Sequence, residues 1–212
     1  MTEFLTNNAS AVFAIIGTLS GAIVTGLINF SLKKRETKLR ITEKLLDKKL
    51  EAHEALIEIT NVIRTMVLLG GADYDNELKR SPLIMQSRKN MDDFLTELMK
   101  VQTKTDRWLS TSAKREVSLF LDYFVNLNEY SRNSSDAALE KAGVLVRNDF
   151  IDFALRLENC AHDFFNKDLM KLKYRTDRDW HKYQKEKTYD ELGKTELFKQ
   201  KQKVIEVLGG NT

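Results

Sequence analysis

The sequence predicts an all-α protein, in which a single N-terminal transmembrane helix is followed by a cytoplasmic helical bundle. The chain has 1 proline and 9 glycines in 212 residues, which is too few turn residues for a β-sandwich or barrel. Residues 9–32 form a run of 24 residues without a charge, which as a helix is about 36 Å long and can cross a bilayer. Beyond this run, apolar residues recur at spacings of three, four and seven, as in amphipathic helices.

Composition excludes several classes of protein. With 42% hydrophobic residues, the chain has enough apolar material for a packed core, so it is not disordered throughout. Its single cysteine, Cys160, excludes an intramolecular disulfide framework and a metal site built from several thiolates. The apolar neighbours of Cys160 are typical of a buried thiol in a reducing cytosol.

Residues 9–32 are expected to remain as a membrane anchor rather than to be cleaved as a secretory signal. The preceding residues contain Glu3 but no Lys or Arg, and the apolar run ends directly in Lys33-Lys34-Arg35. By the positive-inside rule, residues 1–8 form a short extracytoplasmic N-terminus and the rest of the chain is cytoplasmic. We therefore expect a single-pass protein of the bacterial inner (plasma) membrane.

The span has two different faces when residues are placed at 100° intervals. One face carries small or weakly polar residues: Ala11, Ala14, Thr18, Gly21, Ala22, Thr25 and Asn29. The pairs Gly17-x-x-x-Gly21 and Ala22-x-x-x-Gly26 let helix backbones approach closely, which predicts a homo-oligomer. Two interpretations stay open: this face only packs, or several copies surround an aqueous path lined by Thr18, Thr25 and Asn29.

Residues 33–69 predict a first long cytoplasmic helix that begins as a stalk. Charges of alternating sign fill its early part, as in a solvated stalk or a short coiled coil. Two apolar stripes then indicate contacts with partners on both sides. Gly70-Gly71 is expected to end this helix.

Residues 70–166 predict the remaining helices of an up-and-down bundle. Ser81-Pro82 is a start signal for the second helix, because serine can cap free N–H groups and proline is tolerated at the first helical position. The third helix is expected at 112–131, after the Ser110-Thr111-Ser112 cluster. The break at residues 133–136 then caps a long fourth helix.

Residues 167–212 predict a basic helical region with interspersed aromatic residues. Between positions 167 and 203 there are 12 Lys/Arg and 7 Asp/Glu, and Thr188-x-x-Glu191 resembles a capping box for a last helix. Basic and aromatic side chains together can follow a phosphate backbone and stack on bases. The candidate anion-binding residues are Lys171, Lys173, Arg175, Arg178, Lys182, Trp180 and Tyr183.

Two other interpretations of this basic region stay open. It can be attracted to anionic lipid at the membrane surface, or it can be a solvated or oligomer-facing surface without a ligand.

Catalytic signatures are absent from the sequence, so neither an enzyme nor a cofactor is expected. The histidines His53, His162 and His181 do not have metal-ligand spacing. Glu158 and His162 are four residues apart on one helix and could supply half a metal site, although such pairs are more often surface pairs. Neither Gly70-Gly71 nor Gly209-Gly210 is followed by the Lys and Ser/Thr of a phosphate loop.

The order of these parts resembles the membrane effectors of Hailong-type bacterial antiphage-defence systems. The similarity covers the layout of the whole chain: an N-out span with a small-residue face, a basic stalk and a helical cytoplasmic bundle. It transfers no functional residue. The resemblance implies a channel-like oligomer regulated by an oligonucleotide that a partner nucleotidyltransferase makes.

The leading hypothesis is a membrane-anchored homo-oligomeric effector whose spans form a gated pore under the control of a nucleotide or single-stranded oligonucleotide. The alternative is a membrane-tethered scaffold or adaptor that recruits a cytoplasmic protein partner without pore activity. A weaker third hypothesis is a membrane-tethered nucleic-acid binder, whose affinity would fall steeply with salt.

Overall fold

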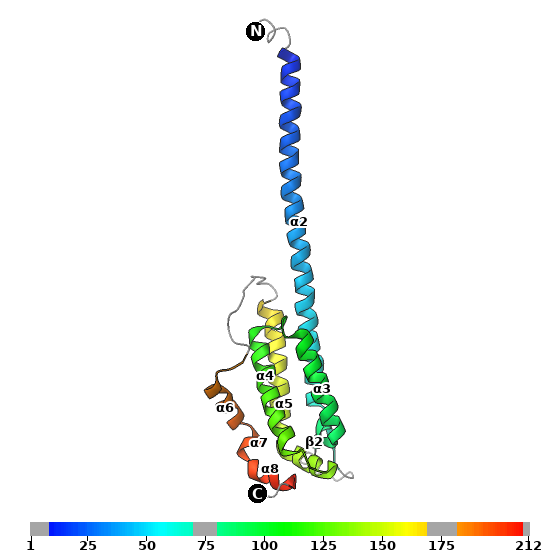
Figure 1. Cartoon of the computed structure of the whole chain (residues 1–212), viewed down its shortest axis with the longest axis vertical. Helices are drawn as coiled ribbons and strands as arrows, with labels where there is room; N and C mark the ends of the chain where they lie inside the picture. The colour runs from blue at the N-terminus through cyan, green and yellow to red at the C-terminus, as the bar shows by residue number, and fades with distance from the viewer. Residues whose placement is uncertain (1–8, 70–79, 169–181, 210–212) are drawn as a thin grey trace. The chain divides into compact units, whose positions relative to one another are not determined.

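The computed structural model describes residues 9–69, 80–168 and 182–209. Regular structure in these residues is helical apart from two strands of three residues each, so the predicted all-α fold class is confirmed (Figure 1). The chain divides into two compact units, Met1–Asp47 and Lys48–Thr212. Because the boundary falls inside helix α2 (Ala9–Arg64), each unit is described separately.

The first unit consists of the N-terminal part of α2. No proline interrupts this helix, and Arg40 forms an ion pair of 2.7 Å with Glu36 one turn earlier. The hydroxyls of Thr37 and Thr42 donate to backbone carbonyls four residues before them. Contacts within the helix therefore satisfy these four side chains locally, and α2 is long and apolar enough at its N-terminal end to cross a membrane.

In the second unit, α2 ends at Arg64 rather than at the predicted Leu69. Residues Met66–Leu68 form strand β1, which pairs antiparallel with strand β2 (Arg80–Pro82). The carbonyl of Thr65 accepts a hydrogen bond of 2.9 Å from the backbone N–H of Leu83, which extends the ribbon. Eleven residues separate the two strands, which is beyond the spacings of three and four that indicate a helix, so the apolar pattern of 66–69 still resembled a helix after α2 had ended.

The prediction that Ser81-Pro82 starts the second helix is wrong, because both residues lie in β2. A 3-10 turn, η2 (Leu83–Gln86), follows this strand, and helix α3 (Arg88–Thr105) begins only after it. The side chain of Ser87 caps α3 by accepting a hydrogen bond of 3.1 Å from the N–H of Asn90. Proline has no backbone N–H to donate. It is therefore tolerated both in an edge strand and at the first position of a helix, where that N–H would have no partner in the strand or helix.

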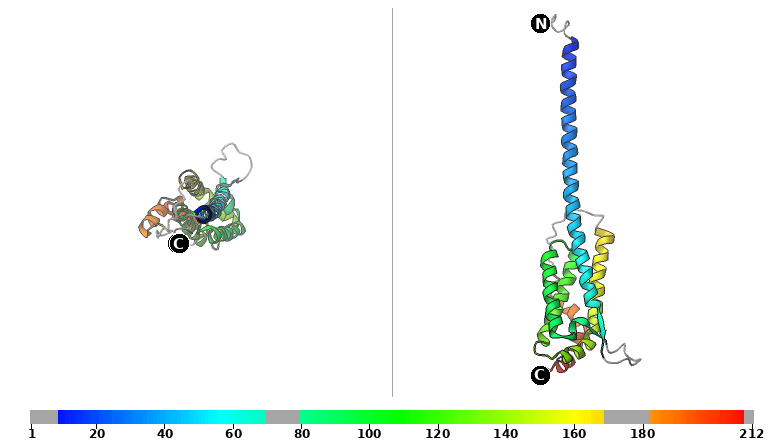
Figure 2. Two further views of the ribbon diagram at one scale, coloured as in Figure 1. Left: turned by 90° about the horizontal axis from the view of Figure 1, so that it is seen from above. Right: turned by 90° about the vertical axis from the view of Figure 1, so that its right-hand side faces the viewer.

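Helices α4 (Thr111–Tyr130) and α5 (Asp136–Asp163) match the third and fourth predicted helices closely. Their N-caps are the serines of the two predicted breaks: Ser110 accepts from the N–H of Ala113, and Ser135 from the N–H of Ala138, each at 3.3 Å. A short π-helix, η3 (Phe164–Asp168), continues α5. In this unit α3, α4, α5 and the end of α2 run side by side in alternating directions (Figure 2).

A cluster of aromatic rings from α3, α4 and α5 forms the centre of the core. Phe120 is fully buried, and its ring centroid lies 5.2 Å from that of Phe153 and 6.1 Å from that of Phe94. Tyr123 is also fully buried and lies 6.1 Å from Phe150. These separations are those of offset and edge-to-face ring pairs, which pack closely without a cofactor between them.

Helix α5 approaches β2 closely at Gly143. A Cβ atom at this glycine would lie 2.0 Å from the hydroxyl oxygen of Ser81 and 3.2 Å from atoms of Pro82 and Met85. The absence of a side chain at Gly143 is therefore what lets the ribbon pack against α5.

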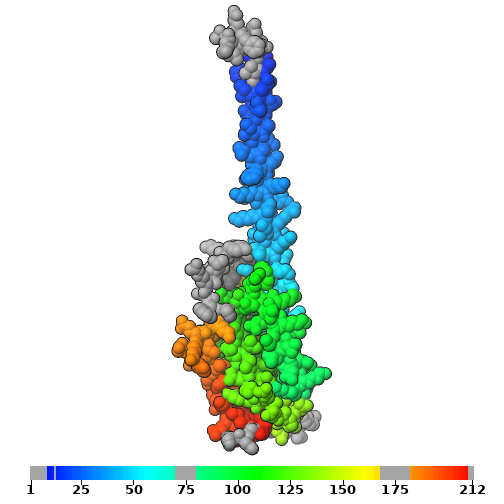
Figure 3. Space-filling model, in the orientation of Figure 1, coloured from blue at the N-terminus to red at the C-terminus, as the bar shows by residue number. Residues whose placement is uncertain are grey.

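The C-terminal segment, Lys182–Gly209, contains helices α6 (Lys185–Gly193), α7 (Glu196–Lys199) and α8 (Lys201–Val207). Helix α6 contacts α4, and α7 and α8 contact α5. Figure 3 shows this segment, in orange and red, against the green surface of the bundle. Thr188 was predicted to cap the last helix, but it lies inside α6. Its hydroxyl bonds back to the carbonyl of Gln184 at 3.2 Å. The polar pattern Thr-x-x-Glu recurs inside helices because threonine can bond to the preceding turn.

A buried carboxylate from α5 caps α7. The Asp149 oxygens accept hydrogen bonds of 2.6 Å and 2.9 Å from the backbone N–H groups of Glu196 and Leu197, and one of 3.0 Å from the Tyr123 hydroxyl. Burial is the main cause that raises the pKa of Asp149, and these hydrogen bonds oppose it. The C-terminal segment is thus attached to the bundle by a buried polar contact as well as by Leu192, Leu197, Val204 and Leu208.

Candidate functional site

The apolar part of α2 has no covering partner among the described residues. Its large apolar side chains from Phe13 to Leu32 are all more than half exposed. A Cβ atom added at Gly17, Gly21 or Gly26 would meet nothing within 4 Å. A surface of this composition requires lipid or other helices around it, because exposing it to water is unfavourable.

The weakly polar residues of this helix differ in how their polar groups are satisfied. The Thr18 hydroxyl lies 3.0 Å from the carbonyl oxygens of both Ala14 and Ile15 and so is satisfied within its own helix. The side chains of Thr25 and Asn29 make no hydrogen bond to a described residue. The amide of Asn29 offers two donors and an acceptor, so it has the greatest need for water or a polar partner.

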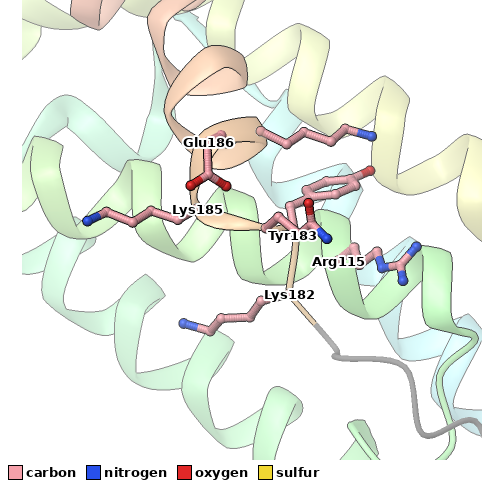
Figure 4. Close-up of a pocket in the computed structure, with 7 residues that line it drawn as sticks. Arg115, Lys182, Tyr183, Lys185 and Glu186 are labelled. Carbon is pink, nitrogen blue, oxygen red and sulfur yellow. The ribbon is translucent and has the colours of Figure 1, made fainter.

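A basic pocket of about 630 Å³ lies between α4 and the start of α6 (Figure 4). Its lining contains four basic residues, one acidic residue, a tyrosine and a glutamine: Arg115, Lys182, Lys185, Lys187, Glu186, Tyr183 and Gln184. Gln184, the N-cap of α6, makes no side-chain capping hydrogen bond. The basic side chains and the N-terminal end of the helix both favour an anion in this pocket.

Of the seven predicted anion-binding residues, the pocket contains Lys182 and Tyr183. The other five, Lys171, Lys173, Arg175, Arg178 and Trp180, lie outside the described residues. Sequence reasoning did not select Arg115, Lys185 or Lys187. Arg115 is 67 positions before Lys182, and no local pattern links residues so far apart.

Tyr183 has a packing role in this pocket. Its hydroxyl donates to Glu116 of α4, and the Lys187 amine lies 4.1 Å from the centre of its ring. Burial and then Glu116 raise the pKa of Tyr183 to about 12, so the phenol stays protonated at neutral pH. Its hydroxyl therefore donates to Glu116, and one face of its ring contacts Lys187.

Beside the pocket, Arg156 of α5 links α4 to α6 of the C-terminal segment. Its guanidinium lies 2.8 Å from a carboxylate oxygen of Glu116 and 2.8 Å from one of Glu191 in α6. Glu116 is 7% exposed, so this ion pair is shielded from water. The network holds Tyr183 and α6 in place against α4 and α5.

The residues considered for catalysis or metal binding are engaged elsewhere. Glu158 accepts a hydrogen bond from Arg64, and its second oxygen is 4.0 Å from His162. Among the described residues, no group of three or more His, Cys, Asp or Glu side chains could hold a metal. Burial and Glu116 raise the pKa of Cys160 to about 11, which keeps the thiol protonated at neutral pH.

Comparisons with known proteins give no match: no protein-family model, curated protein or solved structure resembles the chain significantly.

Proposed function

We propose that the protein is a membrane-anchored, homo-oligomeric helical effector of the bacterial inner membrane. Residues 9–32 cross the bilayer with the N-terminus outside, and copies associate through the small-residue face. The observation that carries the proposal is the exposed apolar run on an unbroken helix, which is followed directly by Lys33, Lys34 and Arg35. That order of charge fits a cytoplasmic second unit.

The associated spans form a gated pore in this proposal. Thr25 and Asn29 line the aqueous path, and their side chains lack partners within the helix. Thr18 lies on the same face seven residues before Thr25, but its hydroxyl is already satisfied by its own helix. We therefore expect Asn29 to contribute most to conductance and Thr18 least.

An anionic ligand controls the pore, and the basic pocket is its receptor. Four cationic side chains from α4 and the C-terminal segment support a ligand with several phosphates, such as a nucleotide or a single-stranded oligonucleotide. The similarity of layout to Hailong-type effectors supports a role for this response in antiphage defence.

The test is the membrane potential of bacteria that express the full-length protein. The Asn29→Leu/Thr25→Leu double variant should abolish depolarisation but leave the oligomer intact in detergent. The matched control is Leu27→Ile/Ile23→Leu on the opposite, apolar face, which should depolarise the cells as the native chain does. Conductance retained by the first variant would refute the pore assignment.

The pocket has a separate test, the binding of a labelled oligonucleotide to the purified full-length chain. Arg115→Glu/Lys182→Glu should weaken binding and lower its salt dependence. The control is Lys201→Glu, a lysine that lies over the Tyr130 ring and does not line the pocket. Equal binding by both variants would exclude the pocket as the receptor.

The alternative proposal is a membrane-tethered scaffold. Ile151 and Leu155, one turn apart on α5, are 41% and 50% exposed and offer an apolar contact for a protein partner. A scaffold should keep its function when residues 9–32 are replaced by an unrelated leucine-rich span of equal length. A pore should lose its function on the same replacement.

A further inference from the structure

The buried ring of His53 packs between three elements of the second unit. His53 lies in α2 and is 0% exposed. Its ring stacks on Phe164 of η3 with centroids 3.7 Å apart and planes 10° apart, and Phe165 meets it edge-on at 6.2 Å. The third element is the turn before α4, which contributes Ser110.

The hydrogen bonds of the ring define its protonation state. Nδ1 lies 2.7 Å from the carbonyl oxygen of Lys49, which can only accept, so Nδ1 carries a hydrogen. Nε2 lies 3.3 Å from the backbone nitrogen of Ser110, which can only donate, so Nε2 carries none. Only the neutral ring with its hydrogen on Nδ1 makes both bonds.

Ionisable side chains lie on each of these elements. On α2 they are Lys48, Lys49, Glu51 and Glu54. Around the turn between α3 and α4 they are Lys104, Asp106, Arg107 and Lys114. At the end of α5 and in η3 they are His162, Asp163 and Lys167, and η3 ends at Asp168. Several of these pair with one another: Glu51 with Lys48 and Lys104, Asp106 with Lys114, and Asp163 with Lys167.

We propose that His53 makes the packing of the C-terminal part of α2 within the second unit sensitive to acid. Protonation places a hydrogen on Nε2 that faces the Ser110 N–H, so this hydrogen bond is lost. It also places a positive charge on a ring that is shielded from water by Phe164. The proposal goes beyond the proposed function, because it holds whether residues 9–32 conduct or only anchor.

The direction of the pH effect follows from the two states of the chain. In the unfolded chain His53 binds a proton below about pH 6.5, the ordinary range of histidine, whereas the folded ring stays neutral. The stabilising contribution of His53 is therefore complete above that pH and is lost as the pH falls below it. The folding equilibrium constant should fall by up to about tenfold per pH unit from this residue alone.

The experiment is urea unfolding of the full-length chain in detergent micelles at pH 7.5, 6.5 and 5.5. His53→Gln is the test variant, because glutamine supplies a donor and an acceptor that do not titrate. His162→Gln is the matched control, because the His162 side chain is 58% exposed. The ratio of the wild-type folding constant to that of His53→Gln should fall up to tenfold between pH 6.5 and 5.5, whereas His162→Gln should follow the wild type.

A second measurement does not depend on a variant. In the ¹⁵N-histidine NMR spectrum of the wild type, His53 should show the neutral Nδ1–H form at pH 5.5. A charged His53 ring in the folded chain at pH 5.5 would overturn the proposal. An identical pH dependence of the wild type and His53→Gln would also overturn it.

Discussion

The two units of the chain differ in where their apolar side chains find partners. In the first unit, Phe13 is 74% exposed and Phe30 is 70% exposed. In the second unit, Phe120 and Phe150 are fully buried within one aromatic cluster. The second unit therefore contains the contacts that stabilise it, whereas the described residues leave the large apolar side chains of the first unit uncovered.

This difference determines how a substitution acts in each unit. Removing a buried ring from the second unit loses burial and leaves a cavity, so the free energy of unfolding falls. Removing an exposed ring from the first unit leaves no such cavity, because the described residues do not enclose it.

The largest effect is expected from Phe120→Ala. Loss of a fully buried ring should lower the free energy of unfolding by about 3–5 kcal/mol. Urea unfolding in detergent, followed by the fluorescence of Trp108, measures this change, because Trp108 packs against the core. Phe13→Ala is the control and should leave the unfolding midpoint unchanged; a shift with Phe13→Ala would show that the second unit depends on the first.

The next effect is expected from Asp149→Asn. This variant loses the carboxylate that caps α7 and accepts from Tyr123, and we expect a loss of about 2 kcal/mol. Amide exchange of Glu196 and Leu197 should accelerate, whereas exchange in the first unit should not change. Unaltered exchange at these two amides would show that the apolar contacts alone hold α7.

The effect of Asp149 should also depend on pH. Because burial raises its pKa, the folded carboxyl binds a proton more readily than the unfolded one. Its stabilising contribution is complete below the ordinary Asp range, about pH 3.9, and decreases as the pH rises through the raised pKa. The difference in stability between wild type and Asp149→Asn should therefore be larger at pH 4.5 than at pH 7. A difference that stays constant with pH would contradict a raised pKa of Asp149.

The same substitution, glycine to alanine, can be made in each unit and its effects compared. In Gly143→Ala the new methyl group would meet Ser81, Pro82 and Met85, so we expect a loss of about 1–3 kcal/mol from overpacking. Gly21→Ala adds the same methyl group to α2 where nothing lies within 4 Å, and it should not alter unfolding of the second unit. Its effect should be on association of the spans, measured by crosslinking in membranes, because the small-residue ridge is widened.

Local signals predicted much of this fold from the sequence. Helices α4 and α5 were predicted because Ser110 and Ser135 cap them and their apolar residues follow a helical period. The end of α2 was not predicted, because β1 forms only when it pairs with β2, from which eleven residues separate it. The sequence gives no local indication of that pairing, and Pro82 serves either structure.

The candidate site was predictable to a smaller extent for the same reason. Lys182 and Tyr183 were selected from the local density of basic and aromatic residues. Arg115 joins them only because α4 and the C-terminal segment pack together. The packing role of Tyr183 depends on Glu116 in another helix, so it could not be inferred from neighbours in the sequence.

The smallest effect is expected from Glu51→Gln, near the boundary between the units. Hydrogen bonds from Lys48 and Lys104, and the charges of these lysines, lower the pKa of Glu51 to about 2. Its contribution to stability is thus present above the ordinary pKa of 4.5 and is lost as the pH falls towards 2. Since the Glu51 ion pairs are exposed, 1 M salt should screen them. It should thereby remove the difference in the free energy of unfolding between Glu51→Gln and the wild type.

Glu36→Gln is the matched control for Glu51→Gln, because among the described residues Glu36 pairs within its own helix, with Arg40. The Glu51–Lys104 pair, at 2.9 Å, instead joins α2 to α3. If the second unit is stabilised by contacts between its elements, Glu51→Gln should shift the urea midpoint slightly and Glu36→Gln should not. Equal shifts would mean that each glutamate stabilises only α2. The contact between α2 and α3 through Glu51 would then add nothing to the stability of the second unit.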